Sequence, residues 1–240
     1  MKKNILIQMK EHNIDLITNG AEDFNNIVLC FHGFNGDKRG DAYSGLKHRV
    51  NNSLVCSFDS CGHGNSEVSS EDMRLDIILE EINVVVNYLL NVEPNKPIIL
   101  VAVSYGAYRV MQYLFKYKPK ISKVIYINPA FRFLNILEKA KEFKYSALKE
   151  NDKVVMKKSL NKFMKKEFLD DLFENNLYSK TYDIVYNTEI VVGTRDSLIP
   201  IEDTLEIAKR YEYNVTYVDE EHCFENKESW QIISKMIEEN

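Results

Sequence analysis

The sequence contains little cysteine and no long apolar run. Four cysteines occur among 240 residues, at spacings that fit no zinc site and in numbers too small for a disulfide framework: Cys30, Cys56, Cys61 and Cys223. This usage favours reduced thiols and a cytoplasmic protein. The apolar stretch at residues 5–7 is too short for the core of a signal peptide, and no later run approaches membrane-spanning length. We therefore expect a cytoplasmic protein without a membrane-spanning segment.

Positive charge is also scarce. Lysine and arginine number 31 against 36 aspartate and glutamate residues, which gives a net charge of −5. Because a nucleic-acid-binding domain is expected to be basic, this balance predicts no nucleic-acid partner. Linkers rich in proline or glycine, low-complexity tracts and internal repeats are absent, and the hydrophobic content of 45% is that of an ordinary globular protein. The length permits one large domain or two small ones.

Short β-rich runs alternate with longer helical patterns along the chain. The runs expected to be strands are 27–31, 54–58, 98–103, 124–127, 190–192 and 215–218. Several of them are continuously apolar, as strands covered on both faces of a parallel sheet are. Apolar residues at helical spacing lie between them, at 75–89, 108–115, 205–208 and 229–236. This alternation predicts an α/β protein with a doubly wound, mostly parallel sheet. An antiparallel hairpin is expected before residue 25, with Asn19-Gly20 as its turn signal.

One segment interrupts this alternation. Between Phe131 and Tyr186 the sequence shows no convincing strand, only amphipathic helical stretches. We therefore expect residues 1–130 and 187–240 to form the core, and 131–186 to be a helical cap inserted over the functional edge of the sheet. The alternative is that this segment only adds packing to the core, away from the functional edge. Some apolar positions of the insertion should pack on the core and others should line a pocket: Phe131, Phe133, Leu134, Leu137, Phe143, Phe163 and Phe168.

The sharpest signal is the string Ala102-Val103-Ser104-Tyr105-Gly106. It follows a buried strand and opens a helix, which is the context of a nucleophile elbow, where a strained turn lifts the serine hydroxyl above the sheet edge. Small residues two before and two after the serine allow strand and helix to approach closely. A serine that merely caps a helix is the alternative interpretation. The strand–turn–helix context favours Ser104 as a nucleophile.

A serine hydroxyl needs an adjacent base, and the base needs an orienting group. Of the five histidines, only His222 follows Ser104, and it lies in a loop directly after a predicted strand. Asp196 directly follows another predicted strand, so both side chains are expected at the same sheet edge. The position after the strand 124–127, where an acid could also stand, holds Asn128. We therefore predict a catalytic triad of Ser104, Asp196 and His222.

The chain resembles an α/β-hydrolase over nearly its whole length, and is most similar to the small esterase, monoglyceride-lipase-like and serine-aminopeptidase-like branch. The resemblance is carried by His32-Gly33-Phe34, by the string Asp59-Ser60-Cys61-Gly62-His63-Gly64-Asn65-Ser66, and by the blocks around Ser104, Asp196 and His222. Ala102 departs from the glycine that is usual at that position.

The resemblance implies that the backbone N–H groups of Phe34 and Tyr105 form an oxyanion hole. For Tyr105 this agrees with its place at a helix N-terminus, where an amide needs no intrahelical partner. The resemblance also implies that residues 59–66 form a structural loop, so that His63 is not catalytic.

These features together favour a serine hydrolase that cleaves a carboxylic ester of a small substrate through an acyl-serine intermediate. Thioesters and amides remain possible on the same residues. No organic cofactor and no metal are expected, because the sequence shows no ligand cluster and no phosphate-binding loop. The alternative is a non-catalytic relative that serves as a binding or scaffold protein, since function depends on the site rather than on the fold. The acyl preference and the oligomeric state are not readable from the sequence.

Overall fold

The computed structural model describes residues 2–139, 153–157, 162–179, 181–182 and 186–239. Of the predicted insertion 131–186, the residues 140–152, 158–161, 180 and 183–185 therefore lie outside the described residues, and Phe143 is among them.

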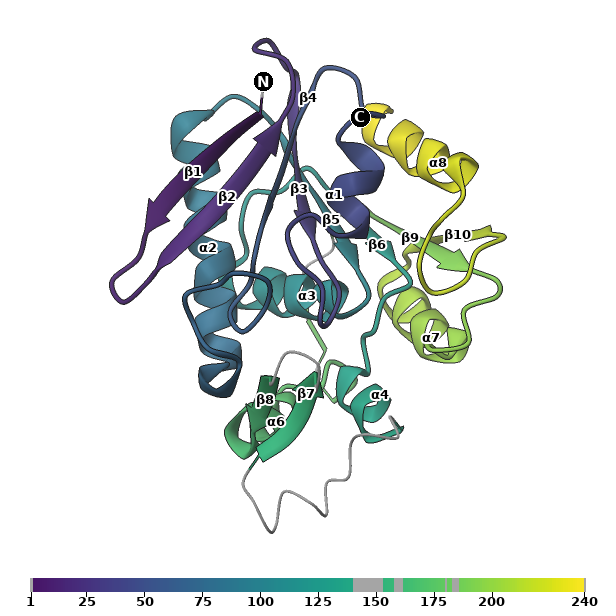
Figure 1. The fold of residues 1–240 in the computed structure, drawn as a ribbon. Helices are drawn as coiled ribbons and strands as arrows, with labels where there is room; N and C mark the ends of the chain where they lie inside the picture. The colour runs from purple at the N-terminus through teal and green to yellow at the C-terminus, as the bar shows by residue number, and fades with distance from the viewer. Residues whose placement is uncertain (1, 140–152, 158–161, 180, 183–185, 240) are drawn as a thin grey trace.

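A single eight-stranded sheet runs through the described part of the molecule, in the order β1-β2-β4-β3-β5-β6-β9-β10 (Figure 1). Six neighbouring strands of this sheet are parallel to one another: β4, β3, β5, β6, β9 and β10. Strand β2 is antiparallel to both β1 and β4. The doubly wound, mostly parallel sheet is as predicted. The strand bounds are β1 Lys2–Gln8, β2 Asn13–Asn19, β3 Asn26–Phe31, β4 Ser53–Phe58, β5 Ile98–Val103, β6 Lys123–Ile127, β9 Thr188–Gly193 and β10 Asn214–Val218.

The predicted N-terminal hairpin is present, but its turn is not at Asn19-Gly20. Strands β1 and β2 pair from Lys2 with Asn19 to Gln8 with Asn13, so the turn occupies residues 9–12. Gly20 instead follows the end of β2, where a Cβ would lie 2.6 Å from the carbonyl oxygen of Ser53. Close approach of two backbones, rather than a tight turn, explains this glycine.

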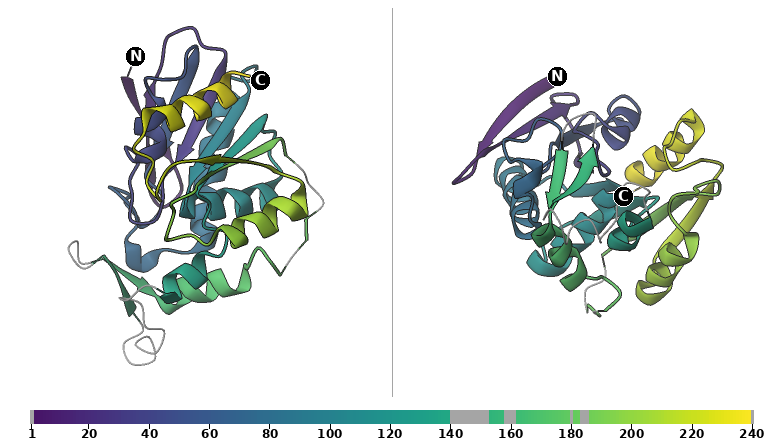
Figure 2. Two further views of the ribbon diagram at one scale, coloured as in Figure 1. Left: turned by 90° about the vertical axis from the view of Figure 1, so that its right-hand side faces the viewer. Right: turned by 60° about the horizontal axis from the view of Figure 1, so that its bottom comes forward.

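Helices cover both faces of the sheet. On one face lie α1 (Asp41–Leu46) and α8 (Lys227–Glu238), and on the other α2 (Leu75–Val92), α3 (Tyr105–Tyr117) and α7 (Ile201–Tyr211). The turned views in Figure 2 show the sheet between these two sets of helices. The central strand β5 sends alternate side chains to the two faces, because the side-chain period of a strand is two. All six of its residues are consequently buried.

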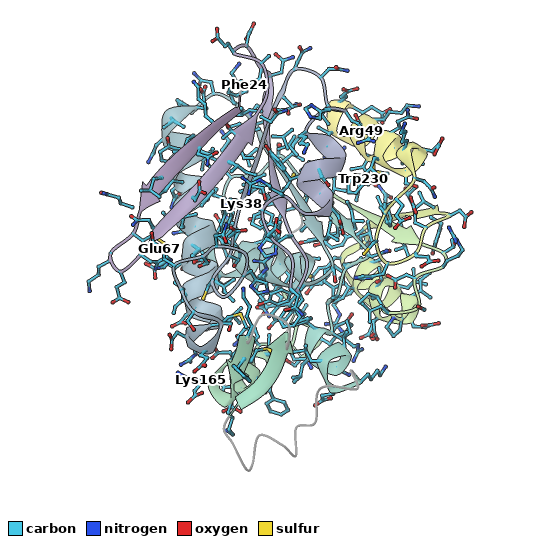
Figure 3. The ribbon with its side chains drawn as sticks, viewed as in Figure 1. Phe24, Lys38, Arg49, Glu67, Lys165 and Trp230 are labelled. Carbon is cyan, nitrogen blue, oxygen red and sulfur yellow. The ribbon has the colours of Figure 1, made fainter. Side chains whose placement is uncertain are left out.

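Helix α1 was not predicted, because its six residues are too short for a periodic signal. Its interior Gly45 lies against Trp230 of α8, which Figure 3 labels, and a Cβ at Gly45 would be 2.4 Å from the indole ring. The absence of a side chain therefore allows α1 and α8 to pack together on the sheet.

The described residues of the insertion form two helices and a two-stranded antiparallel sheet. The helices are α4 (Phe133–Lys139) and α6 (Lys166–Glu174), and the strands are β7 (Lys153–Lys157) and β8 (Lys162–Lys165). The expectation that this segment contains no strand was therefore wrong. Strands of five and four residues are too short for period 2 to be distinguished from a helical period. In Figure 1 these elements lie together at the lower end of the view, beyond α3.

Polar contacts attach the insertion to the core. The guanidinium of Arg74 donates to both carboxylate oxygens of Asp171 on α6, at 2.8 and 3.0 Å, and the backbone N–H of Leu75 donates to the same carboxylate at 2.9 Å. Lys165, labelled in Figure 3, forms an ion pair of 3.1 Å with Asp72. These contacts fix α6 and β8 against the start of α2.

Candidate active site

Ser104 lies at a sharp turn between β5 and α3. Its φ of 52° and ψ of −120° place a non-glycine residue in a strained region of backbone space. Three backbone hydrogen bonds hold the turn: the N–H of Ser104 donates to the carbonyl of Ile127 at 3.0 Å, and the carbonyl of Ser104 accepts from the N–H groups of Ala107 and Ala130 at 3.0 and 3.1 Å. Gly106 permits the turn, because a Cβ there would lie 2.8 Å from the carbonyl oxygen of Phe31. This is the strand–turn–helix geometry expected from the sequence.

Ser104, His222 and Asp196 form one hydrogen-bonded row. The Nδ1 atom of His222 lies 2.8 Å from Oδ2 of Asp196, and its Nε2 atom lies 3.1 Å from Oγ of Ser104. A carboxylate can only accept a hydrogen bond, so Nδ1 carries the proton and Nε2 is left to accept the serine hydroxyl. The structure thus brings together the three side chains that the sequence predicted, although Ser104 and Asp196 precede His222 by 118 and 26 residues in the sequence.

The Asp196 carboxylate is fixed from its other side. Its Oδ1 atom accepts hydrogen bonds from the backbone N–H groups of Leu198 and Ile199, at 2.8 and 3.1 Å. The Asp196 side chain is only 3% exposed, whereas the His222 side chain is 22% exposed. The orienting carboxylate is therefore held by three donors and shielded from water, while the imidazole remains accessible from the site.

Asn128 fixes the loop that carries His222, a role that the sequence did not predict. It occupies the position after β6 where an acid could also stand. Its side-chain Nδ2 donates to the carbonyl oxygens of Glu221 and His222, at 2.9 and 3.0 Å, and its Oδ1 accepts from the N–H of Gly193 at 2.7 Å. Asn128 is 1% exposed and has a φ of 41°. The feature of the sequence that indicates such a role is a polar residue directly after a buried strand.

The backbone N–H groups of Phe34 and Tyr105 lie beside Ser104. Tyr105 is the first residue of α3, so its N–H has no intrahelical acceptor. Within the described ranges, no hydrogen bond engages the N–H of Phe34 either. Phe34 follows Gly33, where a Cβ would lie 3.4 Å from Cβ of Ser104. Two unengaged donors therefore border the serine.

His63 takes no part in this row. It is 1% exposed, and its Nδ1 atom lies 2.9 Å from the carbonyl oxygen of Cys61. Burial lowers the pKa of His63 well below its ordinary value, so the ring is neutral. The loop around it is anchored by Asp59, which accepts from the Nζ of Lys38 at 2.7 Å (Lys38 is labelled in Figure 3) and from the N–H of Asn65 at 3.0 Å. The segment 59–66 has the structural character that the resemblance implied.

A cavity of about 620 Å³ opens above Ser104 and His222. Its wall on the side of the insertion is mostly apolar, and the apolar residues come from α4 and β8: Phe133, Ile136, Leu137 and Met164. Of the apolar positions predicted to contact a pocket or the core, Phe133 and Leu137 line this cavity, whereas Phe131 and Phe168 are buried in the core. Leu134 packs against that core and Phe163 is partly buried.

Charged and thiol groups on the cavity wall were not predicted. Asp41, the first residue of α1, lines the cavity with Lys139 at the end of α4 and Cys223 beside His222. Burial raises the pKa of the Asp41 carboxyl, against an opposing effect of His222. A six-residue helix and a lone aspartate give no sequence signal for such a position.

The described part of the chain contains no group of three or more His, Cys, Asp or Glu side chains that could hold a metal ion. Among its helices, none is long and apolar enough to cross a membrane.

A family model described as serine aminopeptidase, S33, matches residues 22–180. The chain belongs to the serine aminopeptidase S33 family. The match covers β3, the Ser104 turn and most of the insertion. The comparison with curated proteins gave no match.

Solved structures show the same fold over the full length. A protein from Agrobacterium vitis S4 superposes with a TM-score of 0.82 at 18% identity, over 100% of this chain and 98% of its own. Mouse α/β-hydrolase domain-containing protein 10 gives 0.77 at 14% identity, over 99% and 97%. Est1E from Butyrivibrio proteoclasticus, solved with bound ferulic acid, gives 0.77 at 18% identity, over 98% and 96%. This S33 family member therefore has the α/β-hydrolase fold, and its family is one of hydrolases.

Proposed function

We propose that the protein is a serine hydrolase that cleaves carboxylic esters of small substrates, with Ser104, His222 and Asp196 as its catalytic triad. The observation that carries the proposal is the hydrogen-bonded row in which His222 contacts Ser104 Oγ at 3.1 Å and Asp196 Oδ2 at 2.8 Å. A nucleophile, a base within its reach and a group that orients the base are the parts that acyl transfer needs.

In the first step, Oγ of Ser104 attacks the carbonyl carbon of the ester while Nε2 of His222 takes the hydroxyl proton. The C–O double bond becomes a single bond to an oxyanion, and Asp196 stabilises the imidazolium that forms. The N–H groups of Phe34 and Tyr105 border Ser104 as donors for this oxyanion, which a preorganised pair of backbone amides stabilises more than the ground-state carbonyl. His222 then gives its proton to the departing alkoxide, which leaves as the alcohol.

The second step repeats the sequence with water as the nucleophile. His222 takes a proton from water, the hydroxide attacks the acyl-serine, and the tetrahedral intermediate expels Oγ of Ser104, which recovers its proton from His222. The products are the carboxylic acid and the free enzyme. Every proton is accounted for by the one imidazole, so the proposal requires no cofactor.

The insertion, which we interpret as a cap, should select the acyl group. Ligand pockets are mostly apolar with a few placed polar groups, and the α4 wall of the cavity has that character. Phe133 is 3% exposed and lines the cavity that Ser104 also lines, with its ring centre 4.1 Å from that of Tyr105. Short-chain or aromatic acyl groups should therefore react faster than charged ones.

The experiment is a panel of p-nitrophenyl esters of increasing acyl length, with a matched thioester and a matched anilide. For the wild type, kcat/KM should rise with each methylene that the cavity accommodates, by an increment of about 1–3 kcal/mol in transition-state binding, and then fall. Ester turnover that Ser104→Ala does not reduce, or no turnover of any acyl substrate, would refute the proposal. The second result would favour a non-catalytic binding protein.

A pair of variants tests the cap. Phe133→Ala enlarges the cavity and should move the optimum to longer acyl chains. Phe168→Leu, in the same insertion but buried in the core away from the cavity wall, should leave the optimum unchanged. An unchanged profile in both variants would mean that α4 does not contact the acyl group.

A further inference from the structure

Arg109 is a fully buried arginine that takes part in no step of the proposed reaction. It lies on α3 and is 0% exposed. Burying a charge is costly unless the charge is paired. Among the described residues no hydrogen bond joins Arg109 to a carboxylate, and the charge of the buried Glu81 favours the guanidinium without such a contact. Its Nη2 donates to the backbone carbonyl of His32 at 2.6 Å, and its guanidinium lies 4.9 Å from the centre of the Tyr105 ring. Its Nε and Nη1 have no hydrogen-bond partner in the part of the chain that the structure describes. This cost calls for a compensating role.

The acceptor of this bond lies at the end of β3, two residues before Phe34. The carbonyl of His32 touches the first turn of α3 closely, since a Cβ at Gly106 would lie 2.9 Å from its oxygen. On α3, Tyr105 and Arg109 are four residues apart, so they lie on the same face of the helix. One helix therefore carries the N–H of Tyr105 and, one turn later, the guanidinium that holds the loop carrying the N–H of Phe34.

The His32 ring transmits this fixation to the N–H of Phe34. The N–H of Ser60 donates to Nε2 of His32 at 3.2 Å, so the ring proton is on Nδ1, which donates to the carbonyl of Gly33 at 2.8 Å. Gly36 donates to the same carbonyl at 3.2 Å. The carbonyl of Gly33 and the N–H of Phe34 belong to one planar peptide and point in opposite directions. Holding the carbonyl therefore sets the direction of the N–H.

The neutral state of His32 keeps this arrangement constant with pH. Burial, together with the charge of Arg109, lowers the pKa of His32 to about 3. The ring therefore keeps one donor and one acceptor nitrogen throughout the neutral range.

We propose that Arg109 is a positioning residue that holds the 32–34 loop against α3, so that the N–H groups of Phe34 and Tyr105 converge on the oxyanion of the substrate. Hydrogen bonds from a charged donor are shorter and stronger than neutral ones, which fits the 2.6 Å bond. This role rests on the proposed function: Arg109 does not contact the substrate, but the rate of the proposed hydrolysis depends on it.

The test compares Arg109→Met with the wild type on p-nitrophenyl butyrate. Because misplacing one oxyanion donor is costly, kcat should fall about 10- to 100-fold while KM stays within about threefold. The affinity for a trifluoromethyl ketone, which forms an oxyanion on the serine, should fall by the same factor as kcat/KM. The affinity for the matching methyl ketone should not change. A kcat within twofold of the wild type, or equal losses for the two ketones, would overturn the inference.

Two further variants and a control make the result specific. Arg109→Lys keeps a charged donor and should recover part of the loss, whereas the neutral Arg109→Gln should not. If Arg109→Met does not fold, the affinity for the trifluoromethyl ketone should still decrease from the wild type to Arg109→Lys and further to Arg109→Gln. An Arg109→Gln variant with the affinity of the wild type would contradict the positioning role. Met111→Ala, a cavity in the same buried helix, should lower stability without changing the ratio of the two ketone affinities.

Failure of this inference differs from failure of the proposed function. A wild type that neither turns over esters nor binds the trifluoromethyl ketone refutes the proposed function. An active wild type with an equally active Arg109→Met refutes only the role of Arg109.

Discussion

Replacing Asp196 by asparagine should invert the tautomer of His222. Oδ1 of Asp196 accepts from the N–H groups of Leu198 and Ile199, so the amide oxygen of an asparagine would take that place, where only an acceptor fits. The NH2 group would then occupy the position of Oδ2, 2.8 Å from Nδ1 of His222. Two donors cannot face one another, so Nδ1 would become the acceptor and the ring proton would move to Nε2.

With its proton on Nε2, His222 can no longer accept the hydroxyl proton of Ser104. The corresponding substitution in a serine protease keeps the geometry and lowers kcat about 10⁴-fold, and we expect a loss of that order here. Such a loss corresponds to about 5.4 kcal/mol of transition-state stabilisation, at about 1.36 kcal/mol for each factor of ten. The backbone bonds of Leu198 and Ile199 are retained, so the free energy of unfolding should change little.

The assay is kcat for p-nitrophenyl butyrate, combined with ¹⁵N NMR of the imidazole to identify the protonated nitrogen. Asp196→Ala serves as the comparison, because it leaves His222 free to adopt either tautomer through water. We expect Asp196→Asn to be at least as slow as Asp196→Ala. An Asp196→Asn variant with more than a tenth of wild-type kcat, or with its ring proton still on Nδ1, would refute the argument.

Further predictions concern pH, loop fixation and attachment of the insertion. Burial lowers the pKa of His32 to about 3 and that of His63 well below its ordinary value, so the unfolded chain binds more protons than the folded one below about pH 6.5. The contribution of the two neutral rings to the free energy of unfolding is complete above that pH and is lost as the pH falls, by up to about 2.7 kcal/mol per pH unit for the two rings together. The urea midpoint of unfolding should therefore decrease from pH 7 to pH 5, and equal midpoints would contradict this. Asn128→Ala should reduce the free energy of unfolding by about 2–3 kcal/mol, because it removes three buried hydrogen bonds, and should also lower kcat, because two of them hold the loop that carries His222 and the third holds Gly193 at the end of β9. A loss of stability without an effect on kcat would exclude the second role. A double-mutant cycle on Arg74 and Asp171 should give a coupling of about 0.5–1 kcal/mol in urea unfolding, whereas strictly additive effects would show that the pair does not help to attach α6.

Strand ends made the central residues predictable. Ser104, Asp196 and His222 each follow a buried or β-rich run, and the carboxyl ends of parallel strands meet at one edge of a sheet. Their chemistry then distinguished them from other residues at that edge. The structure places the three side chains within hydrogen-bonding distance of one another, and their catalytic roles stay a prediction.

Residues that act through their backbone or through an amide were harder to recognise. Phe34 and Tyr105 offer N–H groups that every non-proline residue has, so only the resemblance pointed to them. Asn128 has no carboxylate, and its role as an anchor of two loops depends on contacts with residues more than 60 positions away in the sequence. Arg109 falls within an apparently ordinary amphipathic helix, and its burial is a property of the tertiary structure.

The insertion was the least predictable part of the fold. Its short strands carry too few residues for a clear period, and β7 and β8 are rich in lysine, which is not enriched in strands. They pair with each other, and β8 also contacts residues 70–72 through Phe163 and Lys165, so contacts distant in the sequence favour the strands where local propensity does not.

Covalent labelling tests the central claim most directly. The wild type is treated with a fluorophosphonate probe, digested, and mapped by mass spectrometry, with Ser104→Ala and His222→Ala as comparisons. A single modification on Ser104, absent in Ser104→Ala and formed at least about 100-fold more slowly in His222→Ala, is the predicted result for a serine activated by an adjacent histidine base. An unlabelled wild type, or a label on another serine that persists in Ser104→Ala, would contradict the account.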